Sequence, residues 1–410
     1  MTATDLAPAD TSIHPAIDTT RFPGPVVVVH SLTTLTGVCL NRDRDGLPKL
    51  LNCGAAERMR VSPQALIRPA RMRIREQNSS EAQAARSRIL PTMTAQALTQ
   101  RGFDPSDALP AAVLIVAAAG LAIDLTQPGQ SRTLVYVPQP APGHLADLLE
   151  AHWEDLKDAR IATEDAIAQA MHAAAPPEGD TKRKKGKPPL AGSLGKLVPA
   201  PIVHEARKAF APALTEIALF GRMLTEIPNG TVRSAVNVAH AFTVDPVDLL
   251  TDDFTGVDDW QTDGVAGAGM LGAVYLASGT LYRYASLDRR TLRDNLARSG
   301  ATTTAVENAA QLAERQFVTA ITYTLPAARS TRTGSATWPT LAIAASADYA
   351  LTASPAFETP LEPPAGVKAA ERLADYLRRT GNLRGGIARW ISPGGEKAPQ
   401  LPNSLTLEDS

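Results

Sequence analysis

Apolar and polar positions follow strand-like and helix-like periods in separate stretches of the chain. The run from 26 to 35 is apolar enough for a buried strand, and the patterns at 281–285 and 338–347 predict two more strands. Residues 80–235 are rich in Ala and follow mostly a helical period, interrupted by a short strand at 134–137. Strands on both sides of a long helical stretch predict an α+β core assembled from both ends of the chain.

Capping residues predict where two helices begin. Ser62 precedes Pro63, and proline suits the first helical position, so a helix is expected to start there. Thr304 and Glu307 have the spacing of a capping box at the start of a later helix. Pro69 lacks a backbone N–H and is expected to bend or end the first of these helices early.

Composition excludes several classes of protein. A chain of 410 residues with 44% hydrophobic and 20% charged residues has enough apolar content for two or three folded domains and is not fibrous or disordered. The longest apolar run, at 110–124, is shorter than the roughly 18 residues of a membrane span and predicts a buried helix. No secretory signal is visible, so we expect a soluble cytoplasmic protein. Cys39 and Cys53 are too few for a disulfide framework or a zinc site, and no cofactor is expected.

Charge is balanced overall and concentrated locally. Lys and Arg number 41 against 42 Asp and Glu, which does not suggest a globally basic nucleic-acid binder. One stretch, from 58 to 75, holds six arginines and no acid: Arg58, Arg60, Arg68, Arg71, Arg73 and Arg75. Such a composition suits contact with phosphate groups. The stretch 39–52 is expected to be an exposed loop, and the basic tract at 176–189 is interpreted as a solvated loop rather than a further phosphate contact.

Several motifs, in one order along the chain, resemble a known family. They are Cys-Leu-Asn-Arg-Asp at 39–43, Lys49, Arg-Met-Arg-Val-Ser-Pro-Gln at 58–64, Ala-Leu-Phe-Gly-Arg-Met at 218–223, Val-Ala-His-Ala-Phe at 238–242, Phe-Thr-Gly-Val-Asp-Asp at 254–259, Gly-Met-Leu-Gly at 269–272 and Leu-Tyr-Arg-Tyr-Ala at 281–285. With these motifs the chain resembles the CasC-type backbone subunit of the type I-E CRISPR Cascade complex, a member of the RAMP superfamily. The resemblance covers nearly the whole chain except the tails and the tract at 176–189.

The resemblance implies the shape of a right hand, with an RRM-like palm, a helical finger insertion and a β-hairpin thumb. The expected bounds are 22–80, 236–246 and 281–395 for the palm, 81–235 for the finger, 247–280 for the thumb, and 1–21 and 396–410 for loose tails. By composition alone, the acidic and Gly-rich stretch 247–279 predicts an extended excursion.

The resemblance also implies an RNA-binding subunit that is not an enzyme. Copies line up head-to-tail along a CRISPR RNA, each thumb displaces one base in every six, and the other bases stay available to pair with target DNA. Expected partners are therefore the CRISPR RNA, target DNA, further copies of the chain and other Cascade subunits, with no membrane.

The resemblance places the RNA contacts at motif positions. The predicted RNA-binding residues are Arg42, Lys49, Arg60, Ser62, Gln64, Arg68, Arg71, Arg222, Met223, Phe254, Thr255, Val257, Leu271 and Arg329. Arg42 and Lys49 remain open between RNA contact, which the motif favours, and ordinary loop charge. Phe254 favours an apolar wedge beside the displaced base, whereas a Met such as Met223 after an apolar helix is usually a packing residue. Ile67 stands where the family usually has Lys, so one phosphate anchor is lost.

Two other functions compete with this interpretation. Related backbone subunits of type III effectors are similar to RNA-cutting nucleases that use a loop aspartate, and Asp43 and Asp45 lie in such a loop. An isolated carboxylate needs a positioned water, a metal or a second acid/base group, and neither catalytic nor metal-binding residues are predicted. The second alternative is a structural adaptor whose Ala-rich helices bind other proteins. His240, in an apolar stretch, is interpreted as a hydrogen-bonded core histidine.

Overall fold

The computed structural model describes residues 16–79, 83–174, 191–210, 214–256 and 270–408. The chain divides into two compact units: the first comprises Met1–Glu76, Ala235–Leu292 and Glu307–Ser410, and the second Gln77–Ser234 and Arg293–Val306. The sequence placed the helical insertion at 81–235, and the second unit additionally includes the short stretch 293–306. The fold is mixed α+β, as predicted. The basic tract at 176–189 and Val257 lie outside the described residues.

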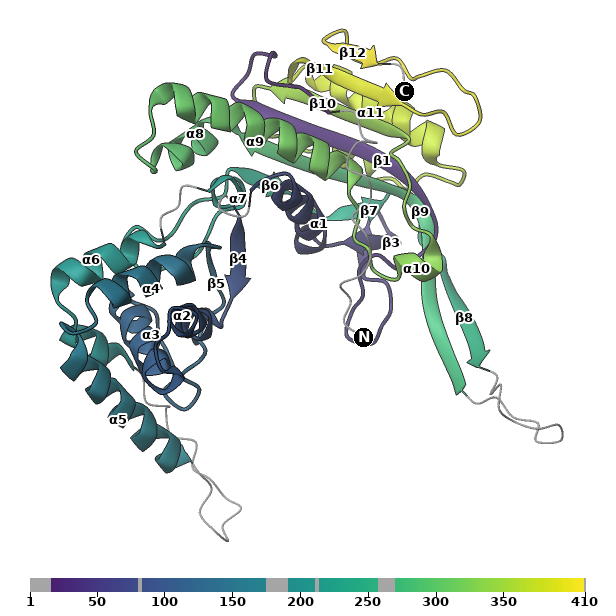
Figure 1. Cartoon of the computed structure of the whole chain (residues 1–410). Helices are drawn as coiled ribbons and strands as arrows, with labels where there is room; N and C mark the ends of the chain where they lie inside the picture. The colour runs from purple at the N-terminus through teal and green to yellow at the C-terminus, as the bar shows by residue number, and fades with distance from the viewer. Residues whose placement is uncertain (1–15, 80–82, 175–190, 211–213, 257–269, 409–410) are drawn as a thin grey trace, which may run out of the picture. The chain divides into compact units, whose positions relative to one another are not determined.

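The first unit is built on one large sheet (Figure 1). Ten strands of the described residues join it: β1 (Val26–Val38), β2 (Leu50–Cys53), β3 (Ala56–Val61), β6 (Val236–Val238), β7 (Ala241–Thr243), β8 (Leu249–Gly256), β9 (Met270–Asp288), β10 (Leu341–Ala347), β11 (Leu383–Trp390) and β12 (Leu405–Glu408). Their order is β12-β11-β10-β1-β9-β7-β3-β2, and β6 and β8 also pair with β9. Strands from both ends of the chain thus meet at its centre, where β1 pairs antiparallel with β9 and β10.

Helices cover both faces of this sheet (Figure 1). The helices of the first unit are α1 (Pro63–Glu76), α9 (Thr303–Tyr323), α10 (Ser330–Thr333), η3 (Ser354–Phe357) and α11 (Gly366–Thr380). α8 (Arg289–Ala297) and the first residues of α9 extend into the stretch 293–306 that belongs to the second unit. Successive side chains of a strand point to opposite faces. Val28 packs with residues of η3 and α11, whereas Val29 lies beside α1 and α9. The continuous apolar run of β1 follows from this, because the strand is buried on both faces.

The second unit is mainly helical. Its elements are β4 (Ala84–Ser87), α2 (Leu90–Thr99), α3 (Pro105–Ala119), β5 (Val135–Pro138), α4 (Ala141–Ala151), α5 (Lys157–Ala174), η2 (Ala191–Leu197), α6 (Ala200–Lys208) and α7 (Thr215–Phe220). β4 and β5 pair antiparallel, and α3 is the central helix, in contact with α2, α4, α5 and α6. All residues of α3 from Pro110 to Ala119 are buried, which confirms the buried helix that the apolar run predicted. Among the described residues, no helix combines the length and hydropathy needed to cross a bilayer.

Both expected tails contain residues that are fixed in the first unit. Thr19 is buried and donates its hydroxyl hydrogen to Glu314 Oε1 at 2.7 Å, while Arg289 donates to the same carboxylate at 2.7 Å. At the other end, β12 pairs in parallel with β11. The expectation of loose tails is therefore wrong for 16–21 and for 405–408. The physical reason is that the N-terminal segment supplies hydrogen bonds to the buried ion pair of Arg289 and Glu314. The C-terminal strand pairs with β11, which would otherwise be an open edge of the sheet.

The expectation that Pro69 ends α1 early is wrong. The helix continues through this residue to Glu76. Leu66, Ala70 and Ile74 recur at a spacing of four residues and are buried. Burial of this face outweighs the one backbone hydrogen bond that proline removes.

The start of α9 is also shifted from its predicted position. Thr302, rather than Thr304, caps the helix: its hydroxyl oxygen accepts the N–H of Ala305 at 3.3 Å, and its carbonyl accepts that of Val306 at 2.9 Å. Glu307 accepts a hydrogen bond from Gln311 one turn further on. The two threonines are two residues apart, and the sequence pattern did not distinguish them.

Candidate nucleic-acid interface

The loop between β1 and β2 is anchored by Asn41. Its side-chain Oδ1 accepts the N–H of Ser62 at 3.0 Å, and its carbonyl accepts the N–H of Lys49 at 2.9 Å. Cys39 at the start of the loop is buried, so the expectation that all of 39–52 is exposed is wrong. Its apolar residues contribute to the core, and its polar residues hold Lys49 beside the first turn of α1.

Asp43 shapes the tip of this loop. One of its carboxylate oxygens accepts the N–H groups of Asp45 at 2.9 Å and Leu47 at 3.0 Å. Aspartate commonly stabilises turns through such side-chain to backbone hydrogen bonds. The adjacent Arg42 is exposed and forms an isolated backbone bridge with Pro48.

Arg58 on β3 is part of the interior. Its side chain is fully buried and donates hydrogen bonds to the carbonyls of Cys53 at 3.1 Å and Glu358 at 2.9 Å, with longer ones to Thr243 and Val244. Burial lowers the pKa of Arg58. One arginine of the basic stretch therefore supports the fold and offers nothing to a ligand.

Arg60 lies two residues further along the same strand and on the same face. It is only partly buried, and its guanidinium donates from Nε to the Leu50 carbonyl at 3.4 Å and from Nη1 to Nδ1 of His240 at 3.0 Å. The backbone N–H of Arg60 also donates to the Lys49 carbonyl at 2.7 Å. The structure thus brings Lys49, Arg60 and His240 together, and RNA contact by Lys49 and Arg60 stays a prediction.

The interpretation of His240 as a core residue is wrong. Its side chain is exposed, because it lies in the short segment that joins β6 to β7. Partial desolvation, together with the positive charges of Arg60 and Lys49, lowers the pKa of His240. Sequence reasoning missed this residue because its alanine neighbours suggested an apolar environment.

α1 begins at Pro63, as predicted. The carbonyl of Ser62 accepts the N–H of Ala65 at 3.0 Å, and the Ser62 side chain is mostly buried. Gln64 and Arg68 are exposed and lie one turn apart, so they share one side of the helix. The free N–H groups at a helix N-terminus favour anions, which suits a phosphate beside this turn.

Three of the predicted cations are available for a ligand. In the described part of the chain, the side chains of Arg42, Lys49 and Arg68 make no hydrogen bond or ion pair. Arg71, by contrast, is partly buried and already interacts within the protein.

Arg329 has a left-handed backbone, with φ of 55°, immediately before α10. Its Nη1 is buried and makes no hydrogen bond to the described residues. Its positive charge and that of Arg42 both act on the thiol of Cys39, whose pKa burial raises. Arg329 and Arg42 therefore face the same end of β1.

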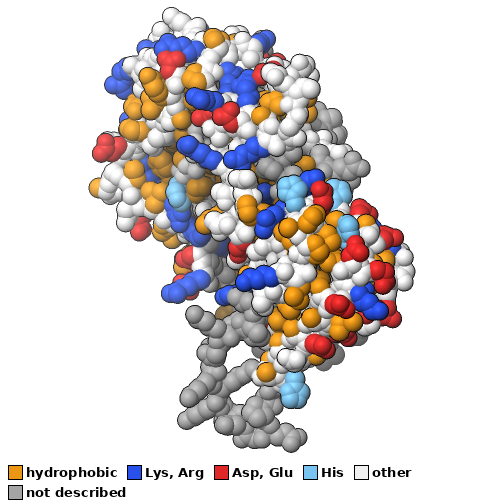
Figure 2. All heavy atoms as spheres, turned by 90° about the vertical axis from the view of Figure 1, so that its left-hand side faces the viewer, with side chains coloured by type: hydrophobic (Ala, Val, Ile, Leu, Met, Phe, Trp, Pro, Cys, Tyr) orange, Lys and Arg blue, Asp and Glu red, His pale blue; other side chains and the backbone are white. Residues whose placement is uncertain are grey.

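On the face that Figure 2 shows, charged side chains of both signs lie among the described residues. Figure 2 shows Lys and Arg side chains interspersed with Asp, Glu and apolar side chains, in keeping with the formal charge of -1. Among the described residues, no group of three or more His, Cys, Asp and Glu is arranged to hold a metal ion. The candidate interface is therefore a local set of cations around the start of α1.

The expected wedge residues lie on the hairpin formed by β8 and β9. Phe254 pairs with Gly272, and Thr255 pairs with Leu271. The Phe254 ring covers Gly272 so closely that a Cβ atom there would lie 2.6 Å from Phe254 Cζ. Leu271 is 77% exposed, and because paired strands alternate their faces, it points away from the face that carries Phe254. The hairpin is a regular strand pair, where composition alone predicted an extended excursion.

Two further residues accompany Phe254. Met270 pairs with Gly256 on the face of the hairpin that carries Phe254 and is 56% exposed. The guanidinium of Arg332, in α10, lies 6.0 Å from the Phe254 ring centroid, within cation–π range. The alternation of glycines opposite large side chains could have indicated Met270. Nothing in the sequence pattern indicated Arg332.

Arg222 and Met223 belong to the second unit. Arg222 is 4% exposed and donates at 2.8 Å to the carbonyls of both Gly230 and Phe210. Burial lowers its pKa to about 10. The prediction that Arg222 binds RNA is corrected accordingly, since its guanidinium stabilises the protein interior. Met223 is 85% exposed, so the interpretation of this methionine as a packing residue is also wrong.

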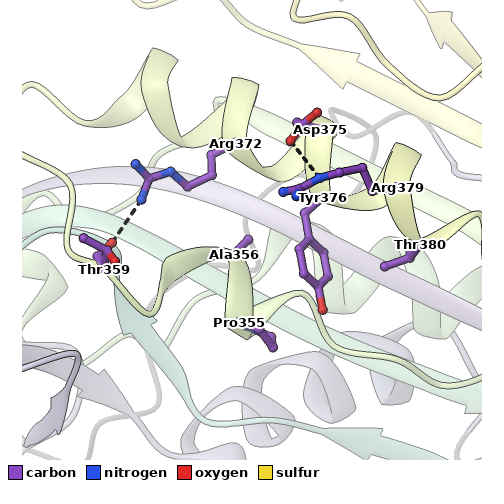
Figure 3. Close-up of a pocket in the computed structure, with 8 residues that line it drawn as sticks. All are labelled: Pro355, Ala356, Thr359, Arg372, Asp375, Tyr376, Arg379 and Thr380. Carbon is purple, nitrogen blue, oxygen red and sulfur yellow. Dashed lines mark hydrogen bonds and ion pairs between the residues drawn. The ribbon is translucent and has the colours of Figure 1, made fainter.

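A cavity of about 570 Å³ lies elsewhere on the first unit, between η3 and α11 (Figure 3). Its cations are engaged within the protein: Arg372 donates to the Thr359 carbonyl at 3.0 Å, and Arg379 pairs with Asp375 at 2.9 Å. This cavity contains none of the predicted RNA-binding residues.

Comparison with known families decides which group of proteins the chain resembles. The family model of CT1975-like proteins matches residues 27–406. The chain belongs to the CT1975-like protein family. The match spans the sheet of this CT1975-like protein from β1 into β12. No curated protein matches the chain.

This CT1975-like chain is also similar to chains in solved structures of CRISPR complexes. One chain of a "CRISPR RNA-guided surveillance complex, pre-nicking" is 28% identical, with a TM-score of 0.72. A chain of a "CRISPR RNA-guided surveillance complex" is 25% identical, with a TM-score of 0.64. Each alignment covers 94% of this chain and 96% of the other. These similarities support a Cascade-type CRISPR protein.

Proposed function

We propose that this protein is a CRISPR RNA-binding backbone subunit of a type I-E Cascade complex. It holds the sugar-phosphate strand of the guide without reading bases and leaves the bases free to pair with target DNA. The observation that carries this proposal is a set of cations without protein partners around the start of α1: Arg42, Lys49 and Arg68. The chain that presents them is similar to a subunit of an RNA-guided complex. A strand of any sequence presents the same phosphates, so cations and helix N–H groups are sufficient.

The proposed palm consists of β10, β1, β9 and β7, in that order across the sheet, with α1 and α9 on one face. This arrangement supports an RRM-like palm, in which the connections run strand, helix, two strands, helix, strand. The hairpin of β8 and β9 is the proposed thumb. Copies that repeat along an RNA make head-to-tail contacts, which give an open helical array rather than a closed ring.

The proposed role is binding without catalysis. The carboxylate of Asp43, the candidate nuclease residue, accepts two backbone hydrogen bonds and stabilises its own loop. Incubating the assembled complex with target RNA and Mg²⁺ or Mn²⁺ tests this. Intact RNA is the expected result. Cuts at regular intervals that Asp43→Ala abolishes would show a type III-like nuclease instead.

The experiment that tests RNA binding uses charge reversal. Lys49→Glu and Arg68→Glu are each expected to weaken RNA loading on two guides of unrelated sequence by the same factor, because phosphate contacts carry no sequence information. Lys368→Glu is the matched control, since this exposed lysine lies on α11, on the opposite face of the sheet from α1. A loss that depends on guide sequence would contradict phosphate holding.

A structural adaptor would give a different outcome from the same material. It would purify without RNA, and its binding to partners would not follow salt concentration as RNA binding does. The proposed subunit is expected to retain small RNA after co-expression with its neighbouring genes, and to release it as salt rises. Sequencing of that RNA identifies it as a guide or as unrelated RNA.

A further inference from the structure

The side chain of Arg60 is held in place within the protein, and its role on the RNA rests on the proposed function. Arg60 differs from Arg42, Lys49 and Arg68 in having its charged group fixed. Nε donates to the Leu50 carbonyl at 3.4 Å, and Nη1 lies 3.0 Å from Nδ1 of His240. The second contact joins two side chains that are 180 residues apart in sequence.

The direction of this hydrogen bond follows from chemistry. Arginine is always a donor and carries no acceptor, so Nδ1 of His240 must be the unprotonated nitrogen that accepts. The other ring nitrogen then carries the hydrogen in the neutral ring. The lowered pKa of His240 agrees with a neutral ring at neutral pH.

The location of His240 explains why it reaches Arg60. β3 and β7 pair antiparallel, with Arg60 opposite Phe242, and His240 lies two residues before Phe242. The N–H of Ala239 is bonded to the Tyr284 carbonyl at 3.1 Å, which ties the segment that carries His240 to the central strand β9. His240 is thus a surface side chain on a fixed backbone.

We propose that His240 is a positioning residue, whose Nδ1 holds the guanidinium of Arg60 in the orientation that contacts the RNA backbone. A free arginine side chain loses rotamer freedom when it binds a phosphate, and a guanidinium already held in place loses less. Nη2 of Arg60 makes no hydrogen bond to the described residues and stays available for the strand. His240 acts through Arg60 and needs no contact with the RNA.

Charges around the pair define how it responds to pH. The groups that act on His240 are Arg60 from β3 and Lys49 from the loop ahead of β2, both positive. When the ring gains a proton, Nδ1 stops accepting and a third positive charge joins the two cations. The hydrogen bond between His240 and Arg60 is therefore lost as pH falls through the titration of His240.

The test is a set of variants in the full-length protein bound to a synthetic guide RNA. His240→Ala is expected to weaken RNA binding about three- to tenfold, the range for one hydrogen bond. His240→Asn is the rescue variant, because its side-chain oxygen lies near the place of Nδ1 and can accept from Arg60. It is expected to bind within about twofold of the unchanged protein. Because the His240 side chain is exposed, thermal midpoints are expected to stay unchanged in both variants.

A double-mutant comparison separates positioning from direct contact. With Arg60→Ala already present, adding His240→Ala is expected to have no further effect beyond about twofold at pH near 8, and the coupling is expected to shrink as pH falls. Full additivity, or failure of His240→Asn to restore binding, would overturn the proposal. If instead Lys49→Glu and Arg68→Glu bind RNA as tightly as the unchanged protein does, the proposed function is overturned. The two failures are therefore distinguishable.

Discussion

β3 carries two arginines in opposite environments, one toward its inner end and one toward its outer end. Arg58 is fully buried and donates to four backbone carbonyls, whereas Arg60, two residues later on the same face, reaches the surface and is held by His240. The inner end belongs to the core under η3, and the outer end belongs to the candidate interface. A run of arginines therefore combines structural and binding residues, and only the environment of each guanidinium separates them.

The largest expected effect is at the inner end. Arg58→Met is expected to lower the free energy of unfolding by about 3 kcal/mol, because buried carbonyls lose their donor. Arg60→Met is the matched control at the outer end and is expected to cost less than about 1 kcal/mol. Chemical denaturation of both variants measures this. Equal losses would remove the distinction between the two ends.

The second effect concerns a buried histidine in the same interior. His30 is fully buried with Nδ1 3.0 Å from the Tyr282 hydroxyl, and burial lowers its pKa from 6.5 to about 3. As the pH falls, His30 of the unfolded chain is protonated before His30 of the folded chain. The contribution of the neutral ring to folding stability is therefore present above pH 6.5 and is lost as pH falls towards 3. Between pH 7 and pH 5 the loss is about 2 kcal/mol. His30→Gln is expected to flatten this slope in denaturation curves, and an unchanged slope would contradict the assignment.

A smaller effect is expected at the outer end, on binding rather than on folding. Lys49→Gln removes one phosphate contact, so the slope of log binding constant against log salt is expected to become shallower by about 0.7. Titrations of guide RNA at several salt concentrations give this slope. Arg44→Gln, in the same loop but outside the predicted site, is the control and is expected to keep the original slope. A shallower slope for Arg44→Gln alone would place the contact at the loop tip.

The smallest effect on stability is expected on the hairpin. Phe254 is only partly buried, so Phe254→Gly is expected to cost less than about 1 kcal/mol while loosening the periodic displacement of guide bases. Nuclease footprints of the bound guide measure the second effect. Leu271→Gly, on the opposite face of the hairpin, shows whether both faces contribute. Unchanged footprints for Phe254→Gly would contradict the wedge role.

Much of the fold could be predicted because local signals agreed with the final packing. The valines of β1 predict a strand buried on both faces, the apolar run of α3 predicts the central helix of the second unit, and Pro63 marks the first residue of α1. Each of these signals is carried by neighbouring residues. The expectation that Pro69 ends the helix also came from a local signal. It failed because the local cost of the proline is outweighed by contacts that α1 makes with strands distant in sequence.

The candidate site was less predictable because it depends on contacts between distant segments. Arg222 and Arg68 both match motif positions, yet one is enclosed by carbonyls and the other is exposed. His240 became part of the site only through the pairing of β3 with β7. Phe254 and Leu271 are both predicted RNA-binding residues, but the register of the hairpin places them on opposite faces.

The pairing of β1 has a consequence for how the chain is made. Val26 lies opposite Asp288 on one side and Ala347 on the other, so the first strand leaves the ribosome long before either neighbour exists. Most of the second unit is synthesised in the interval and has local contacts with which to fold. Until β9 emerges, β1 is therefore an unpaired apolar segment of the nascent chain, and such segments are prone to aggregation.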